Sequence, residues 1–450
     1  MRNMDVIVIG GSSAGYLTAM TAKNHFPEKT VMIIRKESKA MIPCGIPYIF
    51  GSLQNSDQNL IPDENLIRAG VEILIDEVMS YDLKNKVCKT KNEQEISFEK
   101  IVFATGSVPK VPDWLAGIGL ANVFTVPKDK AYLDLFHDSI SQLHKIIVIG
   151  GGFIGVEIAN ELTKSGKEVA VVEVLPHVLN AVFDEAVAKK VEEALIENGV
   201  KVKTGSSIKE ILGQDKVSGV LLDNGETLEA DAVVLSMGYT PNTELAKNSG
   251  LKVNDIGQID VDEYMRTDNY DVFAVGDCAQ KRDFFTRRIT LGMLASTASA
   301  EARIVGMNLY GLVTTKNFKG TLSIFFTSIG KQSFGVVGLT FSKAKKQNLP
   351  VFVSKFESPD KHPYTLPEMH MQSVELVVLK ESGLVLGGTI IGGPSIGELV
   401  NMIGLAIQNN MTVFDILTIQ IGTHPLLTAA PQTYPFIKAA EMAVKRLRKK

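Results

Sequence analysis

The chain is poor in cysteine and has no long apolar run. Its three cysteines, at positions 44, 88 and 278 of 450 residues, form neither a C-x-x-C pair nor a metal-ligand spacing. That pattern excludes a disulfide framework and favours a reducing compartment. No uncharged apolar stretch reaches the ~18 residues of a membrane span, and the first residues carry no signal-peptide pattern. We therefore expect a cytoplasmic protein with no membrane partner.

Charge and composition indicate a globular protein of several domains that does not bind nucleic acid. The net charge is -3, and the main basic run is the C-terminal "KRLRKK", so we expect no nucleic-acid partner. Hydrophobic residues make up 45% and charged residues 22% of the chain, which is ordinary globular usage. A chain of this length exceeds a single hydrophobic core and predicts roughly two to four domains.

The clearest signal that is present is an internal repeat. "DVIVIGGSSAGYLTA" from Asp5 is echoed by "KIIVIGGGFIGVEIA" from Lys145, and "TVMIIRK" and "KEVAVVEV" follow the two copies. In each copy a Val/Ile run suited to a buried parallel strand passes through glycines into a helical pattern. The sequence therefore predicts two strand-loop-helix-strand units of the kind that bind dinucleotides.

The residue pattern changes near residue 316. From there, apolar runs broken by glycine, such as "SVELVVLKESGLVLGGTIIGG", predict antiparallel strands followed by helices. We predict an α/β protein with two Rossmann-like domains and a C-terminal α+β domain. The predicted boundaries are residues 1–115 with 240–315 for the first domain, 116–239 for the second, and 316–450 for the third.

The second copy fits G-x-G-x-x-G at Gly150, Gly152 and Gly155. These glycines allow a tight turn, close approach of a pyrophosphate and helix-on-strand packing. Glu173 ends the next strand and is placed to accept hydrogen bonds from a ribose 2'-hydroxyl. Because a carboxylate there disfavours a 2'-phosphate, we expect NADH rather than NADPH.

The first copy departs from this pattern. Ser12 replaces the middle glycine, and Arg35 stands where the strand-end acid is expected. Glu37 follows two residues later. Spacing leaves open which side chain holds the ribose.

Several ordered motifs resemble the pyridine nucleotide-disulphide oxidoreductases, the FAD-containing relatives of glutathione reductase. "IVFATGSVP" resembles the strand and turn beside the flavin nucleotide, and "TDNYDVFAVGDCA" resembles the second FAD motif, with Asp277 by the ribityl chain or pyrophosphate. "GGGFIGVEIA" resembles the NAD fingerprint, with Glu157 near the nicotinamide and flavin. The similarity runs from about residue 4 to about residue 440 and implies a homodimer formed by the C-terminal domain.

The resemblance implies two sets of cofactor residues and no metal site. For FAD they are Gly10, Gly11, Ser12, Ser13, Ala14, Gly15, Arg35, Lys36, Pro43, Val78, Ala104, Thr105, Gly106, Gly276, Asp277 and Ala295. For NADH they are Gly150, Gly152, Phe153, Ile154, Gly155, Glu157, Glu173 and Gly238. The spacing of His362 and His370 without further ligand residues argues against a metal.

Cys44, in "PCGIPY", is the expected redox residue. Glutathione reductase-like members carry C-x-x-x-x-C, but the positions five residues from Cys44 are Lys39 and Ile49. The segment instead resembles the single-cysteine branch of NADH oxidases, NADH peroxidases, coenzyme A-disulfide reductases and persulfide or polysulfide reductases. A cysteine that opens a helix has its thiolate stabilised by the helix N-terminus. Cys88 and Cys278 are expected to be structural.

Three other positions bear on which branch member this is. Ser13 stands where peroxidase and oxidase members carry a histidine. This difference weakens the hypothesis that the protein reduces peroxide. Leu427 stands where coenzyme A-disulfide reductases supply a tyrosine. His424-Pro425 resembles the cross-subunit acid-base histidine of dihydrolipoamide dehydrogenase, although Ala429 replaces its carboxylate partner. Tyr364 is a poorer candidate on the substrate side.

We therefore expect an enzyme that passes electrons from NADH through FAD to Cys44 and on to a disulfide, persulfide or polysulfide such as coenzyme A disulfide. The alternatives are an NADH oxidase that reduces dioxygen, with Cys44 cycling through sulfenate, and a reductase of a small redox protein such as rubredoxin. A non-enzymatic nucleotide sensor is a more distant alternative.

Overall fold

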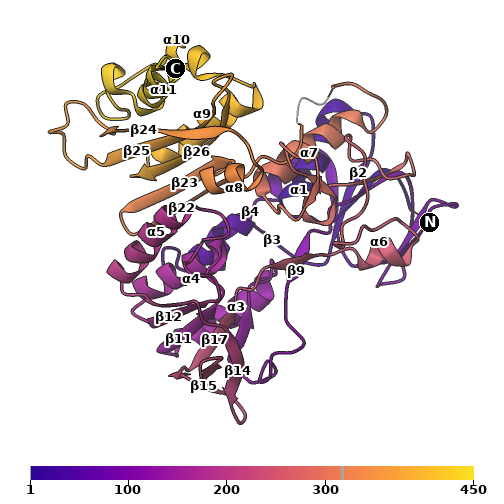
Figure 1. Ribbon diagram of the computed structural model, residues 1–450. Coiled ribbons are helices and arrows are strands. Elements are labelled where there is room, and N and C mark those ends of the chain that lie inside the picture. The colour runs from indigo at the N-terminus through magenta and orange to yellow at the C-terminus, as the bar shows by residue number, and fades with distance from the viewer. Residues whose placement is uncertain (1, 316–318, 450) are drawn as a thin grey trace. The chain divides into compact units, whose positions relative to one another are not determined.

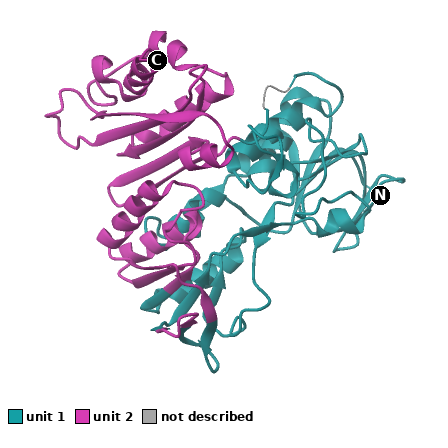
Figure 2. Ribbon diagram, in the orientation of Figure 1, with its two compact units in different colours: residues 1–146, 210–220, 228–321 teal, residues 147–209, 221–227, 322–450 magenta. Residues whose placement is uncertain are grey.

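The computed structural model of the protein describes residues 2–315 and 319–449 (Figure 1). They form two compact units (Figure 2). Unit 1 comprises residues 1–146, 210–220 and 228–321, and unit 2 comprises residues 147–209, 221–227 and 322–450. The chain passes between the units within β11 (Lys145–Ile149), β14 (Ile208–Gly213), β15 (Val217–Leu222) and β16 (Thr227–Glu229).

Unit 1 is built on a sheet with the order β5-β2-β1-β8-β7-β6, and β19 also pairs with β8. The pairs β1–β2, β2–β5, β1–β8 and β8–β19 are parallel, whereas β6, β7 and β8 pair antiparallel. The strands are β1 (Arg2–Ile9), β2 (Val31–Arg35), β5 (Val71–Ile75), β6 (Val78–Asp82), β7 (Val87–Thr90), β8 (Glu95–Phe103) and β19 (Val272–Ala274). The Val/Ile runs of β1, β2 and β8 are buried on both faces, as parallel strands between layers must be.

One helix, α1 (Ser13–His25), follows β1 directly and packs on this sheet in unit 1. A second helix, α7 (Ala295–Asn308), packs on α1. A Cβ at Gly306 of α7 would lie 2.5 Å from the Thr21 Cβ of α1, so glycine lets the helix backbones approach closely. The glycine loop that precedes α1 is thereby held at the carboxyl end of β1.

Apart from α3, a helix of 12 residues, the remaining elements of unit 1 are short. They are β3 (Ala40–Met41), η1 (Pro43–Phe50), η2 (Ser56–Asn59), β4 (Leu60–Ile61), α2 (Glu64–Arg68), β9 (Ser107–Pro109), β10 (Val123–Thr125), α3 (Lys130–Ser141), β17 (Ala232–Leu235), β18 (Tyr239–Pro241), α6 (Glu244–Asn248), η3 (Gly276–Cys278), β20 (Lys281–Arg282) and β21 (Ile289–Thr290). The pairs β3–β4 and β9–β18 are antiparallel, and β10 and β17 run parallel.

Unit 2 begins with the second strand-loop-helix opening and ends with an antiparallel sheet. The first part contains α4 (Phe153–Lys164), β12 (Glu168–Glu173), α5 (Glu185–Glu197) and β13 (Lys201–Thr204), with β12 and β13 parallel. The sheet has the order β22-β23-β26-β25-β24. Its strands are β22 (Ile324–Ile329), β23 (Gln332–Gly338), β24 (Val351–Pro359), β25 (Met371–Leu379) and β26 (Val385–Gly392).

Three helices pack on this sheet of unit 2, namely α8 (Phe341–Lys346), α9 (Ile396–Gln408) and α11 (Pro435–Leu447). A further helix, α10 (Val413–Thr418), packs on α11, and a short turn η4 (Pro431–Thr433) precedes α11. Val400 of α9 fills the space beside Gly335, and the Ser354 hydroxyl of β24 donates to the Ala439 carbonyl of α11 at 2.6 Å. The apolar runs after residue 320 thus form the antiparallel strands that the sequence predicts.

The predicted α/β fold class is confirmed by these elements. The predicted three-domain boundaries stay a prediction, and the start of the third domain at residue 316 lies outside the described residues. Among the described residues, no helix has both the length and the apolar character that a membrane crossing needs.

Candidate functional site

The first glycine loop has the geometry of a dinucleotide-binding turn. Gly10 has φ +105°, and its N–H donates to the Ile34 carbonyl at 2.8 Å. A Cβ at Gly15 would overlap the Gly10 carbonyl oxygen. Both glycines are therefore required by the protein's own backbone, before any ligand is considered.

Ser12 supplies a buried polar atom at the start of α1. Its carbonyl accepts the first helical hydrogen bond, from the Tyr16 N–H at 2.9 Å, so Ser12 is the N-cap residue. Its Oγ is buried and has no hydrogen-bond partner within the described part of the chain. An uncompensated buried hydroxyl beside the unpaired N–H groups of a helix start fits a phosphate group.

The end of β2 is occupied by an ion pair. The Arg35 guanidinium binds both oxygens of Asp63, at 2.8 and 2.6 Å, and donates to the Glu37 and Ser38 carbonyls at 3.0 Å each. Burial raises the pKa of the Glu37 carboxyl, whereas Lys36 is exposed. The Arg35 guanidinium is therefore already paired with Asp63. The roles of Arg35, Lys36 and Glu37 in holding a cofactor stay predictions.

Asp277 lies beside the first loop, where η3 follows β19. A Cβ at Gly276 would lie 2.9 Å from the Ala14 Cβ, so the segment that carries Asp277 packs directly on the glycine loop. The Asp277 carboxylate accepts hydrogen bonds from Ser107 and Lys128, each at 2.7 Å. Burial acts to raise the Asp277 pKa, but the charge and hydrogen bond of Lys128 and the bond from Ser107 outweigh it and lower the pKa.

The turn after β8 is tied to the same region. The Thr105 hydroxyl donates to the Asn242 carbonyl at 2.5 Å, and the Asn242 N–H donates to the Gly106 carbonyl at 2.9 Å. Ala104 is buried against the Gly15 position. The structure thus brings together the glycine loop, the 104–106 turn and Asp277, which are far apart in the sequence.

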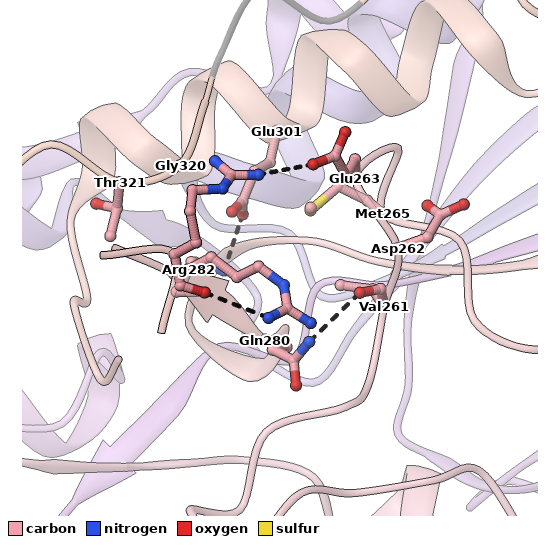
Figure 3. Close-up of a pocket in the computed structure, with 11 residues that line it drawn as sticks. Val261, Asp262, Glu263, Met265, Gln280, Arg282, Glu301, Gly320 and Thr321 are labelled. Atoms are coloured by element: carbon pink, nitrogen blue, oxygen red, sulfur yellow. Dashed lines mark hydrogen bonds and ion pairs between the residues drawn. The ribbon is translucent and has the colours of Figure 1, made fainter. Parts of the chain in front are cut away.

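Figure 3 shows a pocket that is lined in part by Gln280 and Lys281, which follow Asp277 closely in the sequence. Lys281 and Glu301 line it and form an ion pair of 2.9 Å, with both side chains 2% exposed. Lys281 donates to the Gly276 carbonyl at 2.6 Å, and the Gly276 N–H donates to Glu301 at 3.0 Å. Arg287, which also lines the pocket, pairs with Glu263 at 2.6 Å. The buried pair therefore holds the loop that carries Asp277 from both sides.

Cys44 is the exposed thiol among the three cysteines, and Cys88 and Cys278 are buried. It is the second residue of η1, so it opens a helix as expected, and this helix is a 3-10 helix of eight residues. Pro47 lies inside the helix and has no N–H to donate. Burial raises the pKa of Cys88 to about 11 and also raises the pKa of Cys278, as expected of structural thiols.

The second glycine loop repeats the first. Gly150 has φ +105°, and its N–H donates to the Val172 carbonyl at 2.9 Å. A Cβ at Gly152 would meet no atom within 4 Å. The protein itself therefore does not require glycine at position 152, whereas a pyrophosphate close to the backbone would. Phe153, Ile154 and Gly155 follow in the first turn of α4.

Glu173 is tied to this loop. Its two carboxylate oxygens accept hydrogen bonds from the Gly151 N–H at 2.6 Å and the Leu175 N–H at 2.8 Å. A Cβ at Gly151 would lie 3.0 Å from the Glu173 Cβ. The carboxylate thus shapes the loop directly, and each oxygen keeps lone-pair capacity for a ribose hydroxyl.

Glu157 lies one turn into α4 in an apolar setting. Burial raises the pKa of Glu157 to about 7, opposed by a hydrogen bond of 2.8 Å from the Thr327 hydroxyl and aided by the negative charge of Glu161. Phe153 stacks on Phe325, with ring centroids 5.3 Å apart and planes 9° apart. This carboxyl can hold or release a proton near neutral pH.

The other predicted residues are placed as follows. The His424 ring Nδ1 accepts from the Leu426 N–H at 3.3 Å, and the His424 N–H donates to the Thr428 hydroxyl at 3.0 Å. Leu427 is 69% exposed and Tyr364 is 68% exposed. Pro43 begins η1, Val78 begins β6, Ala295 begins α7, and Gly238 has φ +89°. Their functional roles stay predictions.

No cluster of metal-binding side chains occurs in residues 2–315 or 319–449.

Sequence reasoning missed the partners that set the charge of the acids. Ser107 and Lys128 contact Asp277 from 170 and 149 residues away, and Thr327 contacts Glu157 from 170 residues away. No periodicity or motif spacing connects such positions. The contact of Gly151 with Glu173 could have been found from the sequence, because Gly151 lies within the glycine loop and Glu173 is the predicted strand-end acid.

Two family models match the chain. Residues 4–302 match the model described as pyridine nucleotide-disulphide oxidoreductase, and residues 324–435 match its dimerisation domain.

Curated relatives of similar length also match. An NADH oxidase of Methanocaldococcus jannaschii is 30% identical, with 99% of this chain and 100% of that protein covered. An NAD(P)H coenzyme A polysulfide/persulfide reductase of Pyrococcus horikoshii is 30% identical, with 86% and 87% covered. Among solved structures, an NAD-dependent persulfide reductase from A. fulgidus aligns with a TM-score of 0.89 and 27% identity, covering 99% of this chain and 84% of that one.

Proposed function

The chain belongs to the pyridine nucleotide-disulphide oxidoreductase family, and from this premise we propose that it transfers electrons from NADH through FAD to Cys44 and on to a disulfide, persulfide or polysulfide. As a member of this family it is an FAD-type NAD(P)H oxidoreductase. The proposal adds the sulfur acceptor and the single-cysteine route. The observation that carries it is the exposure of Cys44 in a chain whose other two thiols are buried.

FAD, when bound, would accept a hydride from NADH and supply two electrons to a nearby sulfur. The residues described above fit this group. The buried Ser12 Oγ and the amides that start α1 would bind its pyrophosphate. Asp277, held ionised by Lys128, would accept hydrogen bonds from its hydroxyl groups.

The second loop would hold NADH in the same manner. The open space at Gly152 admits a pyrophosphate, and Glu173 would accept from the ribose 2'-hydroxyl. Glu157, with a pKa raised to about 7, would hold a proton near the nicotinamide end. NADH is therefore proposed over NADPH, because the Glu173 carboxylate repels a 2'-phosphate.

The acceptor half of the reaction is a thiol-disulfide exchange. The Cys44 thiolate attacks one sulfur of the acceptor, the sulfur-sulfur bond breaks, and the leaving sulfur departs as a thiolate or sulfide. The two electrons from NADH then cleave the mixed disulfide at Cys44, which regenerates its thiolate and releases the second thiolate. Protonation balances the reaction as NADH, one proton and one disulfide giving NAD⁺ and two thiols.

Two observations support a sulfur acceptor. Ser13 stands where the peroxide-reducing and oxygen-reducing members are expected to carry a histidine. The relative of P. horikoshii and the structural neighbour of A. fulgidus are named for polysulfide or persulfide reduction. The M. jannaschii relative, named NADH oxidase, supports dioxygen as the second candidate acceptor.

The C-terminal dimerisation domain supports a homodimer. In the proposed assembly His424 serves the partner's site as a proton donor or acceptor. Since Ala429 supplies no orienting carboxylate, we expect its contribution to be smaller than that of a His-Asp or His-Glu pair.

The test is a comparison of acceptors under anaerobic conditions. NADH oxidation is measured with coenzyme A disulfide, polysulfide, hydrogen peroxide and a rubredoxin supplied separately, and with an aerated sample. The proposal expects the highest kcat/KM with one of the two sulfur compounds. Faster turnover with dioxygen, peroxide or rubredoxin than with either sulfur compound would contradict it.

A further inference from the structure

Asn59 lies directly against the segment that carries Cys44. Its side chain is buried, with 3% of the residue exposed, and its Nδ2 donates to the Ile42 carbonyl at 2.9 Å. The Asn59 backbone carbonyl in turn accepts from the Ile42 N–H at 3.0 Å. Both backbone polar groups of Ile42, two residues before the redox cysteine, are therefore bound to one residue.

The same side chain also contacts the residue that follows Cys44. A Cβ at Gly45 would overlap the Asn59 Oδ1, so the amide oxygen packs on the bare Cα of Gly45. The Gly45 N–H donates to the Ile42 carbonyl at 3.0 Å, which is the oxygen that also receives the Asn59 amide. Cys44 thus lies in a tight turn whose two sides are both held by Asn59.

Asn59 is itself anchored on both sides. It ends η2, and Ser56 at the start of η2 hydrogen-bonds to Asp134 of α3. Lys130 of α3 pairs with Asp57 at 3.0 Å and with Asp134 at 2.8 Å. The chain then enters β4, where Leu60 and Ile61 pair with Met41 and Ala40 of β3. The support for the Cys44 turn therefore reaches back to a helix of the same unit.

We propose that Asn59 is a positioning residue that fixes the turn of residues 42–45 and so sets the orientation and reactivity of the Cys44 thiol. This inference rests on the proposed redox role of Cys44. The physical reason is that N–H groups that point toward a thiolate stabilise it. Pro43 offers none, and the Ile42 and Gly45 N–H groups already donate to carbonyls, so the N–H groups that remain at the start of η1 must be held in place. An amide side chain with a donor for Ile42 and an oxygen against Gly45 does this.

The experiment measures alkylation of Cys44 in the holoenzyme by iodoacetamide as a function of pH. Because Cys88 and Cys278 are buried, the exposed thiol dominates the reaction. The two test variants are Asn59→Leu, which keeps the side-chain size but removes the donor, and Asn59→Ala. Asn65→Leu is the matched control, since Asn65 is exposed on the neighbouring helix α2.

Both Asn59 variants are expected to slow alkylation at pH 7 by about tenfold and to move the pH of half-maximal rate upward, because the turn no longer presents its amides to the thiolate. The control is expected to match the wild type. A space-filling role would leave Asn59→Leu with the wild-type profile, and that result would overturn the inference.

The Gly45→Ala variant tests the contact between Gly45 and the Asn59 amide by changing Gly45 instead of Asn59. It provides a second test if the Asn59 variants fold poorly. Its methyl group would displace the Asn59 amide, so the same upward shift of the pH profile is expected. In the double variant Gly45→Ala with Asn59→Ala, the two effects should not multiply, because both act on one contact. Independent, fully multiplicative effects would contradict the inference.

This outcome is separable from that of the proposed function. The alkylation profile reports the thiol environment whether or not Cys44 takes part in turnover. If Cys44 proved dispensable for reduction of the sulfur acceptors, the proposed function would fail while the alkylation data would still confirm or refute the contact.

Discussion

The acids of the two glycine-loop sites have opposite electrostatic settings. Asp277 in unit 1 is partly buried, yet Lys128 and Ser107 lower its pKa and keep it ionised. Glu157 in unit 2 is also partly buried, but its partner is the neutral hydroxyl of Thr327, and its pKa rises to about 7. Burial pushes both pKa values upward, so the presence or absence of a cation decides the result.

The backbone of the two loops does not produce this difference. Gly10 and Gly150 have the same φ of +105°. The N–H of each glycine donates to the carbonyl of the second-to-last residue of the neighbouring strand, Ile34 of β2 and Val172 of β12. The comparison teaches that the repeated fold provides two glycine loops of similar geometry, and that contacts from distant parts of the chain set the charge of the acid near each loop. A permanent anion suits binding of cofactor hydroxyls, and a carboxyl that titrates near neutrality suits proton movement.

The largest effect is expected from Asp277→Asn. This change removes the carboxylate of the unit 1 site and leaves the Lys128 ammonium without its ion-pair partner. FAD affinity should fall by about 10–100-fold, the range for losing hydrogen bonds to a charged group. The measurement is titration of apoprotein with FAD, followed by flavin fluorescence.

Glu157→Gln is the matched variant in unit 2, since it removes a carboxyl from the other site. It should leave FAD affinity within about twofold of the wild type, because a glutamine of equal size retains the Thr327 contact. Equal losses of FAD affinity in both variants would erase the distinction between the two acids.

A smaller effect is expected where the two strand ends differ. Arg35 at the end of β2 is paired with Asp63, whereas Glu173 at the end of β12 accepts from the backbone N–H groups of Gly151 and Leu175. Glu173→Ala should lower the ratio of kcat/KM for NADH over NADPH by about tenfold, since the ribose loses an acceptor and a 2'-phosphate loses a repelling charge. Steady-state kinetics with both nucleotides measure this ratio.

The control for the strand-end comparison is Glu197→Ala, which removes an exposed acid of α5 in the same unit. Its coenzyme ratio should equal that of the wild type. A ratio unchanged in Glu173→Ala would show that the acid serves only the Gly151 and Leu175 amides.

The smallest effect concerns stability. The folded-state pKa of Glu157 is raised from 4.5 to about 7, so the folded protein binds this proton more tightly than the unfolded chain does. The resulting stability is fully present below pH 4.5 and is lost as the pH rises to about 7. Over that window the Tm of the wild type should fall by roughly 2–4 °C relative to Glu157→Gln, measured by thermal unfolding of the apoprotein.

Thr327→Val sharpens this test. The Thr327 hydrogen bond lowers the pKa of Glu157 against the effect of burial, so its removal should extend the loss of stability to higher pH. A Tm difference between the wild type and Glu157→Gln that does not change with pH would contradict the raised pKa.

Much of the fold could be predicted from the sequence because its strongest signals are local. The Val/Ile runs at β1 and β11, followed by glycines, specify strand, turn and helix within about fifteen residues. The antiparallel strands after residue 320 also show as apolar runs broken by glycine. Asp277 and Glu173 could be singled out because each ends or follows a recognisable strand.

The electrostatics of the site could not be predicted in the same way. Lys128 meets Asp277, and Thr327 meets Glu157, only through tertiary structure, and neither lies in a motif. Asn59 contacts Ile42 from seventeen residues away in the sequence, and no motif spacing connects the two positions. The helix that Cys44 opens could be predicted, whereas its 3-10 form was not specified by the sequence pattern.

The most direct test of the central claim is Cys44→Ser in the FAD-loaded enzyme. Anaerobic stopped-flow mixing with NADH should bleach the flavin at the wild-type rate, because the NADH half of the reaction does not use the thiol. Turnover with polysulfide or coenzyme A disulfide should fall by roughly 100-fold or more, since the nucleophile that opens the sulfur-sulfur bond is gone. Turnover with these acceptors within about twofold of the wild type would contradict the account.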